Sequence, residues 1–369
     1  MIETAKMPGL PVWKQIVFGF FMIVIIVGLP IILILGVEGV GRAIIHLKYG
    51  VAGKSYGLWQ YDRELGAIHA ANAYNHNSET NNFGFRNKEN VVEPKPANAL
   101  RIIAYGGSTT FSYNLSTDLA WPIRLQEILR AQHNASDQVL NGGDISWSIG
   151  HELARAKRDL PKLKPDFVII YSGVNEEYNA ALLRAEGVSL EQALKDGKTG
   201  LFSRNLDHAR WLKRNSLIIK CRDIKCWDYV GDYVAARWWR SPNAGGAEAH
   251  MAPAQPQAGS GAIDPVVSGN FNATLRDFIA LIQAYGAKPI YVIVGGLPEI
   301  GQNGRLLQYS RQGAEVARQL GVIVLDSQEI IESYNGERRA LFADTGVHWS
   351  ETGAALLASF IYERALKQN

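Results

Sequence analysis

An uninterrupted apolar stretch near the amino terminus dominates the hydrophobic pattern of the chain. Residues 15–37 carry no formal charge and are rich in Ile, Val, Leu and Phe. At ~1.5 Å per residue such a helix would reach roughly 34 Å, enough to cross a hydrocarbon core of about 30 Å. No Ala-x-Ala cleavage pattern follows it, so we expect an uncleaved transmembrane anchor over residues 15–40, after a short polar leader at 1–14. A buried helix of a soluble core is the alternative.

Short apolar runs and segments with helical spacing alternate through much of the remaining chain. Continuous apolar runs are typical of strands that are buried on both faces of a sheet. We expect strands at 102–105, 139–141, 167–171, 289–294 and 322–325, and helices at 121–132, 149–163, 273–285 and 353–367. This alternation predicts an α/β domain, formed by residues 99–178 and 266–369, in which helices cover both sides of a parallel sheet.

Two stretches interrupt this alternation. Residues 41–98 mix aromatic side chains with many Asn and Gly residues, and we expect them to connect the membrane to the domain, with a turn at 82–86 that packs on the domain. Residues 179–265 form an insertion rich in Trp and Tyr. This insertion would be either a small helical subdomain with its own core or a lid or surface that touches lipid or a partner membrane protein. Within it we expect helices at 189–198 and 205–220 and a flexible loop at 243–261.

The charge balance and the cysteines limit which partners and cofactors we expect for this chain. The chain has 38 Lys and Arg residues against 35 Asp and Glu residues, a formal net charge of +3, which gives no reason to expect a nucleic-acid partner. Cys221 and Cys226 would form either a disulfide in an oxidising compartment or two free thiols. No further Cys or His stands beside them at zinc spacing, so we expect no metal there. We expect no cofactor either.

The charges that flank the apolar stretch leave its orientation open. Lys6 and Lys14 precede it, whereas Arg42, Lys48 and Lys54 follow it, so the positive-inside count is equivocal. A disulfide in the insertion would fit an oxidising compartment. We expect a single-pass protein with its amino terminus inside and its domain on the extracytoplasmic, periplasmic side.

Four short motifs fall where a parallel sheet would bring them together. The carboxyl ends of parallel strands share one edge of the sheet, and ligands and nucleophiles collect at that edge. Three motifs each follow a predicted strand, and the fourth precedes the last helix. In chain order they are Gly106-Gly-Ser108, Asn141-Gly-Gly-Asp-Ile-Ser146, Ser172-Gly-Val-Asn175 and Asp344-Thr-Gly-Val-His348.

The residues in these motifs are the types that serine-based acyl chemistry requires. The Ser108 hydroxyl is a poor nucleophile without an adjacent base, and His348 can be that base near neutral pH. Asp344 would hold the imidazole. A tetrahedral oxyanion needs donors aimed at it, each worth ~3 to 4 kcal/mol. The candidate donors are the Ser108 amide, the amide near Ser146 and the Asn175 side chain. Gly107 and Gly143 are expected to belong to the same oxyanion and substrate site.

In type and order, these motifs resemble those of the SGNH (GDSL-like) hydrolase superfamily, in which the serine sits in Gly-Asp-Ser or Gly-Gly-Ser and the base in Asp-x-x-His. The resemblance covers about residues 98–178 and 266–369. It implies a flavodoxin-like three-layer α/β/α sandwich, with Ser108 as nucleophile, Asn175 as oxyanion donor and His348 as base. It also implies hydrolysis, or sometimes transfer, of acyl esters, commonly those of sugars or lipids.

Two positions depart from the family pattern. The glycine that the family places five residues after the Asn of its second motif falls on Ser146, and the aspartate three residues before the histidine falls on Thr345. The backbone amide survives at Ser146, although a side chain restricts its backbone angles. Either the last loop bulges so that Asp344 reaches His348, or the site is a Ser–His dyad.

The sequence as a whole predicts a membrane-anchored serine esterase or acyl hydrolase that acts on sugar or lipid esters. We expect Glu176 and Glu177 to form a solvated pair, and His69 to be structural. Two alternatives stay open. The same site could transfer an acyl group, which would make the protein an O-acyltransferase. The domain could also be a catalytically degenerate accessory subunit of a membrane protein complex, contacted through residues 179–265.

Overall fold

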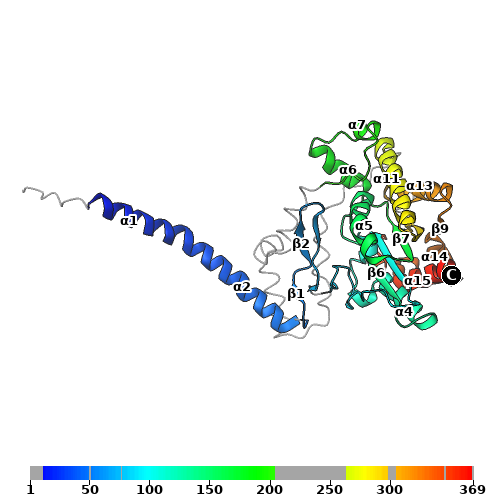
Figure 1. Cartoon of the computed structure of the whole chain (residues 1–369), viewed down its shortest axis with the longest axis horizontal. Helices are drawn as coiled ribbons and strands as arrows, with labels where there is room; N and C mark the ends of the chain where they lie inside the picture. The colour runs from blue at the N-terminus through cyan, green and yellow to red at the C-terminus, as the bar shows by residue number, and fades with distance from the viewer. Residues whose placement is uncertain are drawn as a thin grey trace, which may run out of the picture.

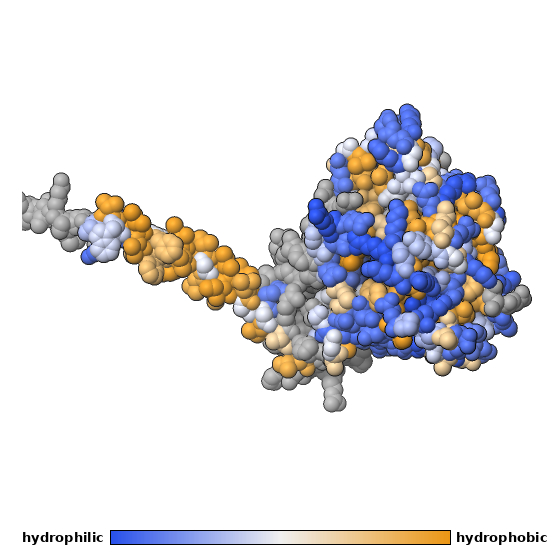
Figure 2. Space-filling view, in the orientation of Figure 1, coloured by the Kyte–Doolittle hydropathy of each residue, from blue (hydrophilic) through white to orange (hydrophobic). Residues whose placement is uncertain are grey.

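The computed structural model describes residues 11–49, 51–75, 77–203, 263–297, 305–344 and 346–367. A long apolar helix projects from the rest of the chain (Figure 1), and apolar side chains cover it (Figure 2). Among the described residues it is the one helix long and apolar enough to cross a membrane, over Val12–Gly41. A membrane span and a signal sequence near the amino terminus share these properties.

This helix contains a π-helical turn that ends two residues before Pro30. It consists of α1 (Val12–Ile23), η1 (Val24–Gly28), which is the π-helical turn, and α2 (Leu29–Tyr49). A proline has no N–H to donate and its ring clashes with the carbonyl four residues earlier, here that of Ile26. The wider π-turn at this point accommodates the proline without ending the helix.

A five-stranded parallel sheet forms the centre of the domain. Its strand order is β6-β5-β7-β8-β9, and every pair of neighbours is parallel. The strands are β5 (Arg101–Gly106), β6 (Gln138–Asn141), β7 (Phe167–Tyr171), β8 (Lys288–Ile293) and β9 (Ile323–Asp326). In the register, Ala104 of β5 lies opposite Asn141, and Gly106 lies opposite Tyr171. The three strands that precede the first three motifs therefore end close together at one edge.

Helices cover both faces of this sheet (Figure 1). Alternate residues of a strand point to opposite faces. Ile103 and Tyr105 of β5 pack in one core cluster with α5 (Ile149–Leu163), α11 (Pro265–Ala284) and α13 (Arg305–Gln319). Ile102 and Ala104 pack in the other with α4 (Trp121–Gln132), α14 (Gln328–Ser333) and α15 (Glu351–Ile361). The expected three-layer α/β/α sandwich is confirmed.

Short elements complete the described chain. The additional helices are α3 (Ser108–Phe111), η2 (Thr117–Leu119), α6 (Glu176–Ala185), α7 (Leu190–Lys195), η3 (Arg338–Leu341) and η4 (Tyr362–Leu366). The additional strands are β1 (Ser55–Tyr56), β2 (Trp59–Asp62), β3 (Gly66–His69) and β4 (Ala73–Tyr74). Strands β2 and β3 form an antiparallel hairpin, whereas β1 and β4 pair in parallel.

The segment between the apolar helix and β5 packs closely on the domain. Leu65, Tyr74 and Phe85 are buried in it. Its residues 86 and 87 run beside the edge strand β6, where the Arg86 amide donates to the Asn141 carbonyl at 2.9 Å and the Asn141 amide donates to Asn87 Oδ1 at 3.0 Å. These bonds cover an edge that would otherwise expose unpaired backbone groups.

Part of the expected insertion lies outside the described residues. The described portion holds α6 and α7, and α7 falls within the helix expected at 189–198. The helix expected at 205–220, the loop expected at 243–261 and both cysteines, Cys221 and Cys226, lie outside the described residues.

Candidate active site

The turn after β5 carries Ser108 at the start of a short helix. Gly106 ends the strand, Gly107 precedes α3, and Ser108 is the first residue of α3. A Cβ at Gly106 would lie 2.4 Å from the Tyr171 carbonyl oxygen and 2.1 Å from Thr110 Oγ1. The two glycines therefore let the backbone turn where no side chain would fit. Ser108 is 8% exposed at the edge of the sheet.

The loop before α15 presents His348 from a narrow hairpin. Phe342 and Trp349 form an antiparallel bridge, and the Ala343 amide donates to the His348 carbonyl at 2.8 Å. The Trp349 indole N–H donates to the Tyr171 hydroxyl at 2.9 Å, which ties the loop to the end of β7. These contacts fix His348 over the same sheet edge as Ser108.

Ser108, His348 and Asp344 form a connected hydrogen-bonded chain. His348 Nε2 lies 2.8 Å from Ser108 Oγ, and His348 Nδ1 contacts Asp344 Oδ2. The other oxygen of Asp344 accepts the backbone amides of Gly346 at 3.0 Å and of Val347 and His348 at 3.1 Å each. The loop therefore brings Asp344 to the imidazole from four residues before it, as the bulged-loop alternative expects.

The surroundings of Asp344 keep this carboxyl group ionised. Burial alone would raise its pKa, but the hydrogen bond and the charge of His348, together with the amides of Gly346 and His348, hold the pKa of Asp344 well below its ordinary value. An ionised carboxylate on Nδ1 fixes the tautomer in which Nε2 is free to accept the Ser108 proton.

Asn175 lies beside the turn that carries Ser108. Its Nδ2 donates to the Trp147 carbonyl at 2.9 Å and lies only 2.6 Å from the position that a Cβ would take at Gly107. The amide group has a second N–H. Gly143 packs behind the same turn, because a Cβ there would lie 2.4 Å from the Phe111 amide nitrogen.

Ser146 adopts the backbone conformation of a glycine. Its φ angle is 65°, in the left-handed region that a side chain disfavours by roughly 1–2 kcal/mol. Ser146 precedes Trp147, whose carbonyl accepts the Asn175 side chain. The substitution of serine for the family's glycine thus leaves the glycine-like turn in place.

The expectation that Glu176 and Glu177 form a solvated pair is wrong. Glu176 is 5% exposed, and one of its carboxyl oxygens accepts the Ile149 amide at 3.1 Å. Burial raises the pKa of Glu176 to about 8, against the smaller lowering effect of that amide. Glu177 accepts a hydrogen bond from the Tyr309 hydroxyl at 2.9 Å. The start of α5 and the core helices thus enclose Glu176, whereas Glu177 is partly exposed.

Several residues around the site gave no signal in the sequence. The Tyr113 ring lies beside that of His348, with 6.1 Å between their centroids. The Trp147 carbonyl accepts the Asn175 side chain, and the Trp349 indole N–H donates to the Tyr171 hydroxyl. Aromatic residues near a strand end are usually core residues, so only the motifs beside them could have pointed to these positions.

The described residues contain no group of three or more His, Cys, Asp or Glu side chains that could hold a metal ion.

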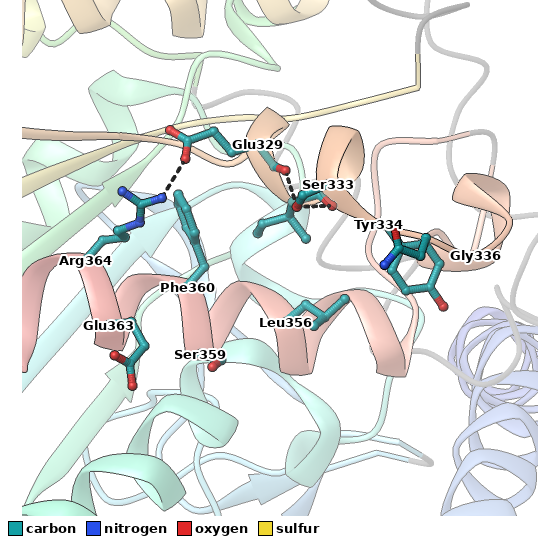
Figure 3. Close-up of a pocket in the computed structure, with 11 residues that line it drawn as sticks. Glu329, Ser333, Tyr334, Gly336, Leu356, Ser359, Phe360, Glu363 and Arg364 are labelled. Carbon is teal, nitrogen blue, oxygen red and sulfur yellow. Dashed lines mark hydrogen bonds and ion pairs between the residues drawn. The ribbon is translucent and has the colours of Figure 1, made fainter.

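A hollow of about 550 Å³ lies elsewhere, between α14 and α15 (Figure 3). Its lining includes Tyr334, Leu356 and Phe360, and the Glu329–Arg364 ion pair of 3.1 Å borders it. None of Ser108, Asn175 and His348 lines it, so it is separate from the candidate active site.

Comparison with known proteins yields one family match. Residues 104–356 match the model of the GDSL-like Lipase/Acylhydrolase family. No curated protein matches the chain.

Solved structures with distant similarity include three that were characterised or classified as lipolytic proteins or esterases. An acetyl xylan esterase, AlAXEase, is 14% identical, with a TM-score of 0.43. The match covers 72% of this chain and 100% of the esterase chain. A catalytic mutant of Axe2, an acetylxylan esterase from Geobacillus stearothermophilus, is 14% identical, with a TM-score of 0.41 and coverages of 73% and 95%. A member of the lipolytic protein G-D-S-L family from Veillonella parvula is 13% identical, with a TM-score of 0.41 and coverages of 73% and 100%.

Proposed function

This chain belongs to the GDSL-like lipase/acylhydrolase family, and on that premise we propose that it is a membrane-anchored serine esterase. The observation that carries the proposal is the distance of 2.8 Å between Ser108 Oγ and His348 Nε2, with Asp344 on the opposite ring nitrogen. Nucleophile, base and orienting acid at hydrogen-bond distance are the arrangement that activates a serine hydroxyl.

In the proposed mechanism, Ser108 Oγ attacks the carbonyl carbon of an ester while its proton passes to His348 Nε2. Asp344 stabilises the resulting imidazolium. The tetrahedral oxyanion accepts hydrogen bonds from the Asn175 side chain and the backbone amides of Ser108 and Ser146. Collapse of this intermediate expels the alcohol, which takes the proton from His348. A water molecule, deprotonated by His348, then cleaves the acyl-enzyme and releases the acid.

Two features support an active enzyme over a degenerate accessory subunit. The degenerate alternative depends on the departures at Ser146 and Thr345. Ser146 has a φ angle of 65°, which a glycine would adopt there, and Asp344 contacts His348 although it stands one position earlier than the family's aspartate. Both departures are therefore compensated by local backbone geometry.

We also propose that the apolar helix anchors the enzyme in a membrane, with its domain on the extracytoplasmic side. The exposed apolar surface of Val12–Gly41 supports the anchor. The substrate would be a carboxylic ester of a sugar or a lipid that reaches this surface. The insertion at 179–265 remains the proposed contact for a membrane-protein partner.

Full-length protein in detergent tests the proposed activity. We expect it to hydrolyse p-nitrophenyl acetate and to react with a fluorophosphonate probe, which forms a bond from Ser108 Oγ to phosphorus and releases fluoride. Ser108→Ala should abolish both, whereas Ser116→Ala, a nearby serine whose side chain makes no cap hydrogen bond, should change neither. Unchanged turnover in Ser108→Ala would rule out the mechanism. Product analysis with and without a sugar acceptor separates hydrolysis from acyl transfer.

A further inference from the structure

The segment between the apolar helix and β5 contributes polar groups to both turns of the candidate active site, of which His69 and Arg86 are buried and Trp59 is half-buried. None of these groups takes part in the proposed chemical steps. Trp59 on β2 and His69 at the end of β3 approach the turn that contains Ser146, and Arg86 approaches the helix that starts at Ser108. Buried polar side chains that bridge separate segments fix the relative position of those segments.

Asp144 connects the hairpin to the Ser146 turn. Its side chain is almost fully buried, and its Oδ1 accepts the Trp59 indole N–H at 3.1 Å and the Ile145 amide at 2.6 Å. His69 Nε2 lies 3.3 Å from the same oxygen. The carbonyl of Asp144 accepts the Trp147 amide at 3.3 Å, which closes a turn with Ser146 at its third position. Asp144 therefore holds this turn at two points, at the Ile145 amide through its carboxylate and at the Trp147 amide through its carbonyl.

Arg86 holds the other turn. Its guanidinium is fully buried, contacts the carbonyls of Phe111 and Leu115, and lies 4.3 Å from the centroid of the Phe111 ring. The His69 ring is also near Phe111, with 5.2 Å between centroids. Phe111 is the last residue of α3, which begins at Ser108. Arg86 and His69 thus hold Phe111, at the end of the short helix that begins with the proposed nucleophile.

The turn at Ser146 requires contacts of this kind from outside the turn itself. Ser146 occupies a strained left-handed conformation, and strained residues persist only where their surroundings determine them. An oxyanion hole also works only when its donors are already aimed before the charge develops.

We propose that Trp59 and His69, acting through Asp144, are positioning residues for the oxyanion donor at Ser146, so that the membrane-proximal segment is part of the catalytic unit. This inference rests on the proposed esterase function. It assigns Arg86 a parallel role toward α3. The segment then determines turnover rather than merely linking two parts of the chain.

The decisive variant is Trp59→Phe in the full-length, detergent-solubilised protein. It keeps a ring in place and removes the indole N–H that Asp144 accepts. We expect kcat for p-nitrophenyl acetate to fall about tenfold with KM unchanged, as for the loss of one hydrogen bond that matters in the transition state. The inhibition constant of phenylboronic acid, which forms a tetrahedral adduct with the serine, should rise by a similar factor. If Trp59 had a purely structural role, Trp59→Phe would lower the melting temperature without lowering kcat at an unchanged KM.

Tyr61→Phe, on the same strand but with a 46% exposed side chain, is the matched control and should keep the wild-type kcat. Asp144→Asn replaces the carboxylate without changing its size and serves if Trp59→Phe does not fold. Wild-type kcat and boronic acid affinity in whichever variant folds would overturn this inference while leaving the esterase proposal intact. A wild-type protein that neither cleaves esters nor reacts with the fluorophosphonate would overturn both.

Discussion

The carboxylate of Asp344 binds His348 twice, once at the backbone and once at the ring. One oxygen accepts the His348 amide at 3.1 Å, and the other contacts Nδ1 of the imidazole. The same group therefore shapes the loop and orients the imidazole ring. A loop that depends on the carboxylate for its own amides holds the His348 ring in place before any substrate binds, which reduces the reorganisation needed during reaction.

Replacing Asp344 with Asn should lower kcat for p-nitrophenyl acetate by about 10⁴, the loss that follows when the orienting acid of a serine protease triad becomes an amide. The amide presents an N–H where the imidazole needs an acceptor and so favours the wrong tautomer. Steady-state kinetics of the detergent-solubilised enzyme measure the effect. A loss below tenfold would mean that the site works as a Ser–His dyad.

Removing the Asn175 side chain tests the oxyanion site. We expect Asn175→Ala to lower kcat by about 10²–10³ with little change in KM, because its donor acts on charge that develops only in the transition state. The Trp147 carbonyl, which accepts Asn175 Nδ2 at 2.9 Å, also loses its partner. Equal losses in binding and turnover would contradict the assigned role.

Ser146 should tolerate glycine and reject a β-branched residue. Ser146→Gly removes the cost of a side chain at a φ angle of 65°, so we expect kcat and the free energy of unfolding to stay near the wild-type values. Ser146→Val should lower the free energy of unfolding by roughly 1–3 kcal/mol, because a β-branched side chain is strongly disfavoured in this region. Urea denaturation of both variants provides the comparison.

The buried carboxyl group of Glu176 should make stability depend on pH. Burial raises the pKa of Glu176 to about 8 in the folded protein, whereas the unfolded chain has the ordinary value. The folded state thus binds the proton more tightly, so this contribution to stability is complete below pH ~4.5 and is lost as the pH rises toward 8, by up to about 1.4 kcal/mol per pH unit.

Glu176→Gln should flatten this dependence in urea unfolding curves recorded between pH 5 and pH 8. The amide oxygen can still accept the Ile149 amide, which Glu176 accepts at 3.1 Å. Glu152, whose pKa burial also raises, leaves a residual slope over the same pH range, so the variant should show a smaller slope than the wild type and still not a flat line. An identical slope in wild type and variant would show that Glu176 is ionised throughout.

Membrane fractionation and intact mass distinguish an anchor from a signal sequence. We expect the full-length protein to stay in the membrane pellet after alkaline carbonate washing, with residues 1–49 still attached. A chain from which residues 1–49 have been deleted should appear in the supernatant, because the exposed apolar surface of Val12–Gly41 is then absent. A shortened mature chain in the wild-type sample would instead identify a cleaved signal.

The sequence predicts the strands of the central sheet well, because a short continuous apolar run between turn residues is typical of a strand buried on both faces. The helices expected from the sequence do not include α13, which has Gly313, a residue that disfavours helix, in its interior. In the structure that glycine is required by packing, because a Cβ there would lie 2.4 Å from the Tyr291 hydroxyl oxygen. A tertiary contact thus accounts for a residue that local propensity disfavours.

The order of motifs was sufficient to nominate Ser108, Asn175 and His348, because each follows or precedes a recognisable element. The link from Asp344 to the imidazole depends on how a six-residue hairpin loop closes, which spacing alone left undecided. The enclosure of Glu176 depends on the packing of α5 and α11, which are distant in sequence. Contacts of this kind become visible only once the elements are placed in space.

If the apolar helix is the anchor we propose, the short connection after it would limit how far the domain can move from the membrane. Five residues, 50–54, separate the end of α2 at Tyr49 from β1 at Ser55, a tether of about 20 Å at full extension. With the helix held in a bilayer as proposed, the domain that carries Ser108 would stay close to the membrane surface. Its substrates would then have to come to that surface.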